Sequence, residues 1–175
     1  MKPAVLRVQA AIAAAGLQGQ VVELGVEART SQQAADAVGV RVEQIAKSLV
    51  FTVDGAPVMV VASGTNRVDE AKLGRLAGGQ VRRADADTVR RATGYAIGGV
   101  PPLGHETALP IWLDEDLLRL DLIYAAAGVP ECVFPLTPDE LVRATGGRIA
   151  DVKESKTLPT KTFPTTKTFP KGGPA

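Results

Sequence analysis

The feature that most restricts the fold of this chain is a glycine- and proline-rich stretch near its middle. Residues 98–104 contain three glycines and the adjacent prolines Pro101 and Pro102. Glycine permits backbone angles that a Cβ forbids, whereas proline fixes φ and lacks an N–H. The stretch therefore cannot continue a helix or lie inside a central strand. It predicts a rigid loop, which is either a plain turn or a wall of peptide groups lying against a ligand.

Strand and helix patterns are interspersed on both sides of this loop. Helical spacing and capping residues predict helices at 3–15, 30–38, 69–77, 85–92 and 137–145, with a further helical turn at 42–46. Apolar runs, alternating or continuous, predict strands at 20–24, 47–53, 58–62, 80–83, 109–113, 122–126, 132–134 and 148–150. The connections after Val53 and Leu113 are too short for crossovers between parallel strands. The sequence thus predicts an α/β fold of the α+β kind, with a mixed, largely antiparallel sheet and helices packed on it.

Length and composition fit one domain followed by a tail. The chain has 175 residues, of which 45% are hydrophobic and 22% charged, as expected for a globular protein with its own core. From Lys153 onward a short Lys-Thr-Leu/Phe-Pro repeat has too few apolar residues for a core. We therefore predict a domain at residues 1–152 and a flexible tail at residues 153–175. A basic arm that touches a polyanion is the alternative for the tail.

Several classes of protein are disfavoured by the composition. The formal net charge is +1, so any footprint for nucleic acid must be local. With a single cysteine, Cys132, and a single histidine, His105, neither a disulfide framework nor a zinc site is expected. The sequence has no Walker loop and no dinucleotide fingerprint, so no cofactor is predicted. It shows no signal peptide and no run of about 20 apolar residues, which predicts a cytoplasmic protein.

A few charged residues could carry chemistry. Lys47 stands at the start of an apolar strand, where it either reaches back to solvent or binds a phosphate or carbonyl oxygen. The carboxylates of residues 114–116 are expected to be solvated on a turn. Cys132 has apolar neighbours, and no pair of nucleophile and base is predicted. Six arginines in the middle third form either a solvated face or a phosphate-binding patch: Arg67, Arg75, Arg82, Arg83, Arg90 and Arg91.

Four stretches, taken together, resemble the YbaK/EbsC family. They are residues 30–35, the run 45–51 around Lys47, the loop 93–104, and the stretch 124–128. Members of that family resemble the editing domain inserted in bacterial prolyl-tRNA synthetases, and the likeness covers about residues 1–152. The resemblance implies a mixed α/β fold and an aminoacyl-tRNA deacylase, a hydrolase that cleaves the ester joining a wrong amino acid to tRNA. The implied partner is aminoacyl-tRNA, with an aminoacyl-tRNA synthetase as a further candidate.

The resemblance also assigns residues to a site. Lys47 matches the family's lysine, which holds the terminal adenosine or the aminoacyl group, and Gly98 to Pro102 match its Gly-x-x-x-Pro loop. In the family, water attacks with help from a ribose hydroxyl, so neither a metal nor a protein nucleophile is implied. The expected substrate-binding residues are Thr30, Ser48, Gly98, Gly99, Val100, Pro101, Pro102, Gly104, His105, Ala126 and Gly128.

One departure from the family leaves the substrate's amino acid open. The related synthetase domain carries a histidine in the late strand-end motif, where this chain has residues 124–128 without one, and His105 is offset in sequence. Small alanines there could shape a pocket for Cys, Ala, Ser, Thr or a non-protein amino acid. Two alternatives to a deacylase also stay open. One is a non-catalytic module that binds tRNA or a synthetase, and the other is a relative of the same fold with a small-molecule ligand.

Overall fold

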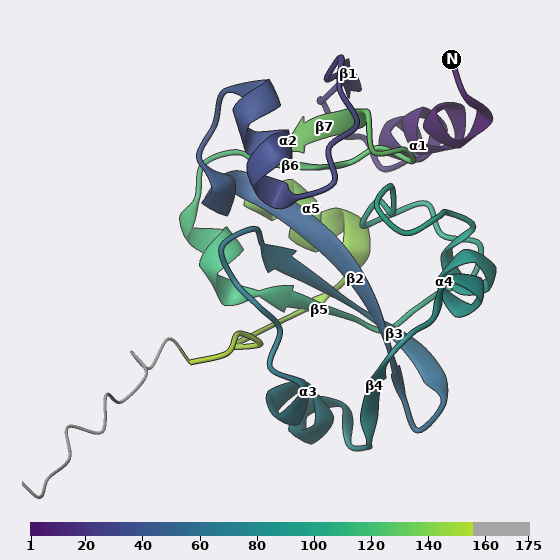
Figure 1. Ribbon diagram of the computed structural model, residues 1–175, viewed down its shortest axis with the longest axis vertical. Helices are drawn as coiled ribbons and strands as arrows, with labels where there is room; N and C mark the ends of the chain where they lie inside the picture. Colours follow the sequence, from purple (N-terminus) through teal and green to yellow (C-terminus); the bar gives the residue numbers. More distant parts are fainter. Residues whose placement is uncertain (156–175) are drawn as a thin grey trace, which may run out of the picture.

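This computed structural model describes residues 1–155, which fold into an eight-stranded sheet with helices on both faces (Figure 1). The strands are β1 (Val22–Glu23), β2 (Ile45–Val53), β3 (Ala56–Ser63), β4 (Val81–Arg83), β5 (Ile111–Asp114), β6 (Ile123–Ala126), β7 (Cys132–Leu136) and β8 (Arg148–Ala150). The helices are α1 (Pro3–Ala14), α2 (Ser31–Val38), α3 (Glu70–Ala77), α4 (Ala86–Thr93) and α5 (Pro138–Thr145), with the short 3₁₀ helices η1 (Val42–Gln44) and η2 (Glu115–Arg119). None of the helices in this part of the chain is long and apolar enough to cross a membrane.

The predicted mixed, largely antiparallel sheet is confirmed. Its strand order is β1-β7-β6-β2-β3-β5-β8, and β4 pairs with β2 outside this order. Within residues 1–155, four strand pairings are antiparallel and three are parallel. The long hairpin of β2 and β3 turns at Asp54 and Gly55, as the sequence predicts, and β8 lies at the predicted edge.

One prediction about local structure was wrong. Ile45 and Ala46 are not part of a helical turn, because they pair with Tyr124 and Ala125 of β6 and so begin β2. The connection after β5 is not a crossover between parallel strands, as predicted, although it passes the ends of β3 and β2 before reaching β6. The register makes β5 and β6 run in opposite directions, so this connection need not return along the whole sheet. It is anchored by Leu117 of η2, which is fully buried.

Capping residues explain where several helices begin and end. The hydroxyl of Thr30 accepts the N–H of Gln33 at 3.1 Å, which fixes the start of α2. Thr137 and Glu140 form the predicted capping box at the start of α5. Gly146 ends that helix with a positive φ of 63°, a backbone conformation that favours glycine. The sequence signals and the helix boundaries therefore agree at these positions.

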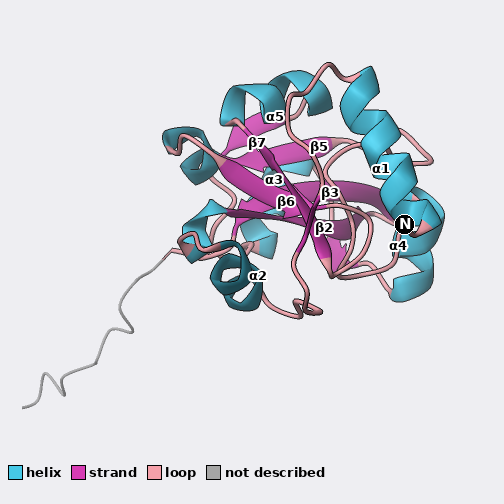
Figure 2. Cartoon of the chain, turned by 90° about the horizontal axis from the view of Figure 1, so that it is seen from above, coloured by secondary structure: helices cyan, strands magenta, loops and turns pink. Residues whose placement is uncertain are grey.

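The two faces of the sheet carry different helices. Side chains of α1, α4 and α5 pack into the larger core cluster, in which Met59 and Phe134 are fully buried. On the other face, α3 packs against a second cluster that contains Phe51 and Trp112, and α2 packs against Ile45. Figure 2 shows α1 and α5 on one side of the sheet and α2 on the other. Because side chains alternate along β2, its even-numbered residues face α1 and its odd-numbered residues face α2 and α3.

The two edges of β2 are paired differently. On one edge, β3 pairs with β2 without interruption from Ala46 to Val53. On the other edge, β6 pairs only with Ile45 and Ala46, and β4 pairs only from Phe51 onward. Within residues 1–155, no strand therefore pairs with residues 47–50 on this second edge. We call this four-residue interval the β2 gap.

The carboxylates of residues 114–116 were predicted to be solvated, and this prediction is wrong for Asp114. Asp114 is fully buried, and its carboxylate accepts hydrogen bonds from Ser63 N at 3.0 Å, Asn66 Nδ2 at 2.8 Å and Asp116 N at 2.9 Å. Asn66 Nδ2 also lies 2.8 Å from Asp116 Oδ2, which accepts a bond from Lys153 Nζ at 2.6 Å. A buried carboxylate needs such donors. The network ties the ends of β3 and β5 to η2.

The residues predicted to begin the tail still contact the domain. Lys153 forms an isolated β-bridge with Val68, and Glu154 N donates to Arg67 O at 2.7 Å. Val152, just before them, is fully buried. The ordered contacts therefore extend beyond the predicted boundary at residue 152. The rest of the predicted tail, residues 156–175, lies outside the described residues.

The Asp114 network leads to a prediction about stability. The substitution Asp114→Asn replaces one acceptor oxygen with an NH₂ group that faces N–H donors. We expect it to lower the free energy of unfolding by about 2 kcal/mol or more, measured by urea denaturation. The exposed Asp121 provides the matched control, and Asp121→Asn should change stability by no more than about 0.5 kcal/mol. Equal stability of the two variants would contradict the role assigned to the network.

Candidate active site

A cavity of about 340 Å³ opens at the β2 gap. It is bounded by the segment leading into α2, by β2 and β6, by the end of β4, and by the glycine- and proline-rich loop. Its lining residues are Ala28, Arg29, Thr30, Ser31, Ala34, residues 45–51, Arg83, Ala84, Val89, Ile97, Gly98, Val100, Tyr124, Ala126 and Val133. Together with Val89 of α4 and Val133 of β7, segments from seven parts of the chain thus meet around the interval where one edge of β2 has no strand partner.

Lys47 lies within the β2 gap and lines the cavity. Its side chain is half-buried on the face of the sheet that carries α2. Among residues 1–155, no side chain or backbone group forms an ion pair or hydrogen bond with its ammonium group. Burial lowers the pKa of Lys47, and the nearby positive charges of Arg67 and Arg83 lower it further, while Asp114 opposes them. A half-buried cation without a direct partner is suited to receive an anionic or carbonyl oxygen.

Ser48 is the second polar residue at the β2 gap. Its hydroxyl is buried and has no hydrogen-bond partner among the described residues, although the residue lines the cavity. Buried hydroxyl groups are usually satisfied, so an orphaned one calls for an explanation. Its position at the cavity wall means that a bound molecule could supply the missing partner.

The predicted loop contributes part of the cavity wall and part of its support. Gly98 and Val100 line the cavity, together with Ile97, which is 61% exposed. Gly99 instead packs against the turn between β6 and β7: its carbonyl accepts the N–H of Gly128 at 2.9 Å. A Cβ at Gly99 would lie 2.6 Å from the oxygen of Gly128, so only glycine fits there. The loop and this turn, about thirty residues apart in sequence, hold each other in place.

His105 and its neighbours lie behind the cavity wall. The Nε2–H of His105 donates to Pro101 O at 2.7 Å, and burial lowers the pKa of this histidine against the opposing effect of that bond. The hydroxyl of Tyr95 donates to Gly104 O at 3.2 Å. Pro101 and Pro102 are buried. These contacts fix the shape of the loop, and none of the residues named here lines the cavity.

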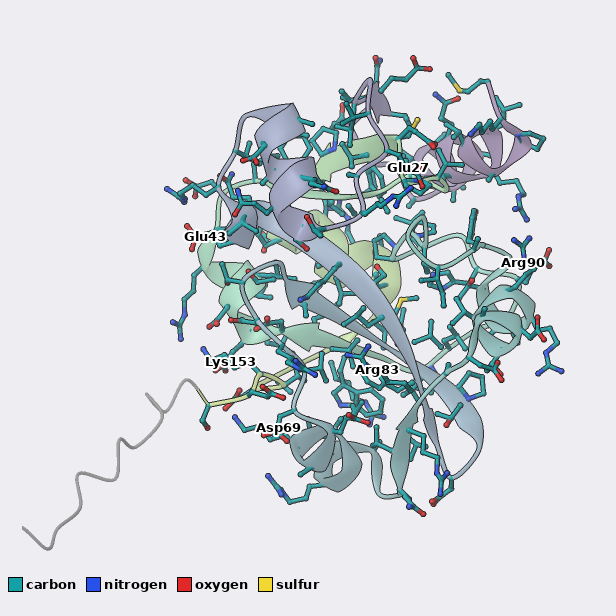
Figure 3. All side chains as sticks on the ribbon, in the orientation of Figure 1. Glu27, Glu43, Asp69, Arg83, Arg90 and Lys153 are labelled. Carbon is teal, nitrogen blue, oxygen red and sulfur yellow. The ribbon has the colours of Figure 1, made fainter. Side chains whose placement is uncertain are left out.

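The structure therefore divides the predicted site residues into two groups. One group lines the cavity: Thr30, Lys47, Ser48, Gly98, Val100 and Ala126. The other does not: Gly99, Pro101, Pro102, Gly104, His105 and Gly128. Of the six clustered arginines, only Arg83 lines the cavity (labelled in Figure 3).

Some lining residues were missed by sequence reasoning. Arg29 immediately precedes the capping residue Thr30, so its position was implied by the start of α2. Tyr124 lies in the stretch 124–128, from which the resemblance assigns only Ala126 and Gly128 to the site. Val89 of α4 reaches the cavity because that helix packs over the β2 gap, which no local pattern predicts.

No Cys, His, Asp or Glu side chain lines the cavity, so the hydroxyl groups there have no carboxylate or imidazole beside them to act as general base. Cys132 lies outside the cavity lining; burial raises the pKa of its thiol, and the negative charges of Glu23 and Glu131 raise it further, which disfavours the reactive thiolate. Within residues 1–155, no cluster of three His, Cys, Asp or Glu side chains could hold a metal ion. The polar side chains that line the cavity are those of Arg29, Thr30, Ser31, Lys47, Ser48, Arg83 and Tyr124. Such a set can bind and orient a substrate.

Comparisons with known proteins agree with this geometry. The profile of the family described as aminoacyl-tRNA editing domain matches residues 26–144. Protein YwhH of Bacillus subtilis is 34% identical over 125 residues, which cover 71% of this chain and 80% of that protein. EbsC of Enterococcus faecalis, by name a candidate Cys-tRNA(Pro)/Cys-tRNA(Cys) deacylase, is 28% identical over 125 residues, covering 70% and 76%.

A solved structure is similar over almost the whole domain. The crystal structure of a candidate trans-editing enzyme for prolyl-tRNA synthetase has a TM-score of 0.85 and 48% sequence identity, and the match covers 88% of this chain and 99% of that one. The family match includes every residue that lines the cavity. The resemblance seen in the sequence is confirmed: the chain belongs to the aminoacyl-tRNA editing domain family.

Proposed function

We propose that this protein is a trans-editing deacylase, which hydrolyses the ester between a wrongly attached amino acid and the 3′ end of tRNA. The observation that carries the proposal is the half-buried, unpaired Lys47 ammonium in a cavity that no Cys, His, Asp or Glu side chain lines. Membership of the editing-domain family supports it. The names of the similar proteins point to mischarged tRNA of the kind that prolyl-tRNA synthetase uses as the substrate class.

In this proposal, Lys47 binds an oxygen of the terminal nucleotide or of the aminoacyl group. Gly98 and Val100 of the loop form part of the wall of the site, and Thr30, Ser48 and Ala126 lie around the amino acid. A water molecule attacks the ester carbonyl with help from a ribose hydroxyl. The protein contributes orientation and fixed donors near the carbonyl as it becomes an oxyanion. No side-chain nucleophile is needed.

The rest of the tRNA would approach over the rim of the cavity. Arg29 and Arg83 are exposed there, where they could contact phosphates of the acceptor end. Ile97, exposed on the loop, offers an apolar surface to a base. Because the chain is almost neutral overall, we expect binding to rest on these few local contacts and to weaken as salt increases.

The role of Lys47 is tested by Lys47→Met, which removes the charge and keeps most of the aliphatic stem. We expect kcat/KM for the best substrate in a panel of mischarged tRNAs to fall about 100-fold, because an oriented charge next to the ester is lost. Circular dichroism and urea denaturation check that the fold is kept. Lys2→Met, at the exposed lysine that immediately precedes α1, is the matched control and should leave the activity unchanged.

The outcomes separate the proposal from its alternatives. Activity of Lys47→Met within threefold of the parent protein would remove the assigned role. If the parent protein binds tRNA specifically but cleaves no ester in single-turnover assays on the whole panel, it is a non-catalytic binding module. An absence of salt-dependent tRNA binding would instead indicate a small-molecule ligand.

A second prediction concerns pH. Because the pKa of Lys47 is lowered from the ordinary 10.5, its charge is lost at a less alkaline pH than that of an exposed lysine. If the protonated form binds substrate, kcat/KM, after subtraction of the spontaneous hydrolysis of the ester, should fall with rising pH before 10.5 is reached. In Lys47→Arg this decline should move out of the accessible range, because a guanidinium keeps its proton. An identical alkaline decline in both proteins would contradict the prediction.

A further inference from the structure

The unpaired edge of β2 exposes main-chain groups in a definite direction. In a strand, the N–H and C=O of one residue point to the same edge, and successive residues point to opposite edges. The carbonyl of Val50 accepts the N–H of Ala84 at 3.3 Å, so Val50 points toward the edge that carries β4 and β6. The carbonyl of Ile45 accepts the N–H of Gly64 and so points to the β3 edge. By alternation, the N–H and C=O of Ser48 both point into the β2 gap.

These groups of Ser48 have no strand to pair with. Pairing with β6 ends at Ala46, and the register with β4 begins at Phe51. Neither register reaches Ser48, and within residues 1–155 no backbone hydrogen bond outside the strand pairings involves its N–H or C=O. The hydroxyl of the same residue is also buried without a partner. One residue thus presents a main-chain donor, a main-chain acceptor and an unpaired hydroxyl at one cavity.

From this arrangement we infer that the aminoacyl group of the substrate binds in the β2 gap as a strand of one residue, paired with the main chain of Ser48. Its α-ammonium donates to the C=O of Ser48, and its ester carbonyl accepts the N–H of Ser48. This is the exchange of two bonds that directly opposed residues make in antiparallel strands. An α-amino acid ester carries the donor and the acceptor at the same spacing as a residue in a chain, so it fits the vacant place.

The dimensions and surroundings of the β2 gap agree with this occupant. Between Ala46, which pairs with β6, and Val50, whose carbonyl accepts the N–H of Ala84, three residues of β2 span roughly 10 Å, which is enough for one amino acid. Directly opposed residues place their side chains on the same face. The substrate's side chain would therefore lie beside the Ser48 hydroxyl, on the face to which Val50, Val89 and Val100 contribute. All three valines line the cavity, so they would give the substrate's side chain an apolar surrounding.

This inference rests on the proposed function and explains how its substrate is held. It is tested with analogues that cannot be hydrolysed: 3′-amino-3′-deoxyadenosine acylated on its amine with alanine, cysteine, serine or threonine. Each keeps the ammonium and the carbonyl. Hydrogen exchange of the ¹⁵N-labelled protein is measured by NMR, free and saturated with the analogue that binds best. We expect exchange of the Ser48 amide to slow at least tenfold.

The amide of Leu49 is the internal control, because it points to the β3 edge and is paired there in both states. Its exchange should change less than threefold. Ser48→Ala should keep the protection of residue 48, since the main chain is unaltered, and Thr52→Val serves as the matched hydroxyl deletion on the same face of β2. An analogue with lactate in place of alanine, which has a hydroxyl instead of the ammonium, should bind at least tenfold more weakly than the alanyl analogue.

The result that overturns the inference is an unchanged Ser48 amide in the saturated protein, or protection that disappears in Ser48→Ala. If such a protein still deacylates mischarged tRNA, the proposed function stands and the binding mode is wrong. Failure of all four analogues to bind a protein that deacylates tRNA also rejects the binding mode. If the protein neither binds an analogue nor deacylates any tRNA, both the inference and the proposed function are rejected.

Discussion

The site of this protein depends on the way in which two short strands share one edge of β2. β3 pairs with the whole length of β2, so that strand is held straight and fully ordered on one side. β6 and β4 approach the other side from its two ends and leave residues 47–50 between them. A gap of this kind inside a sheet provides rigid walls and free main-chain groups together. Lys47 and Ser48 are useful because they occupy this interval.

The walls around the gap are kept in place by contacts that do not line the cavity. Gly99 bonds to Gly128, so the loop cannot move without the turn between β6 and β7. His105 holds the loop from behind through Pro101. The Asp114 network fixes the C-terminal end of β3, where Ser63 pairs with Ala46 beside Lys47, and the negative charge of Asp114 favours the protonated form of Lys47. A substitution behind the wall therefore affects the site through geometry, whereas one in the β2 gap affects it directly.

Much of the fold could be predicted from the sequence, because its signals are local. The Thr30 and Thr137 caps, the Asp54–Gly55 turn and the alternation of residues 48–53 each specify one element. The burial of Asp114 could not be predicted, since its donors come from Ser63 and Asn66, about fifty residues away. The β2 gap could not be predicted either, because it depends on where β4 and β6 begin and end their pairing with β2. For the same reason, motif matching placed Lys47 and Gly98 at a cavity but could not separate them from supporting residues such as His105 and Gly128.

The unfavourable features of the β2 gap are themselves an argument for a ligand. An unsatisfied buried polar group costs about 1–3 kcal/mol, and a desolvated ammonium group without a counter-ion costs stability as well. Here the unpaired Ser48 hydroxyl, the unpaired Ser48 main chain and the unpaired Lys47 ammonium occur in two consecutive residues. By contrast, the buried Asp114 carboxylate has three donors. The other buried side-chain atom without a hydrogen bond among residues 1–155, Asp116 Oδ1, lies 3.7 Å from the guanidinium of Arg119. Their concentration beside a cavity, in a chain of the editing-domain family, is best explained by a polar substrate that completes them.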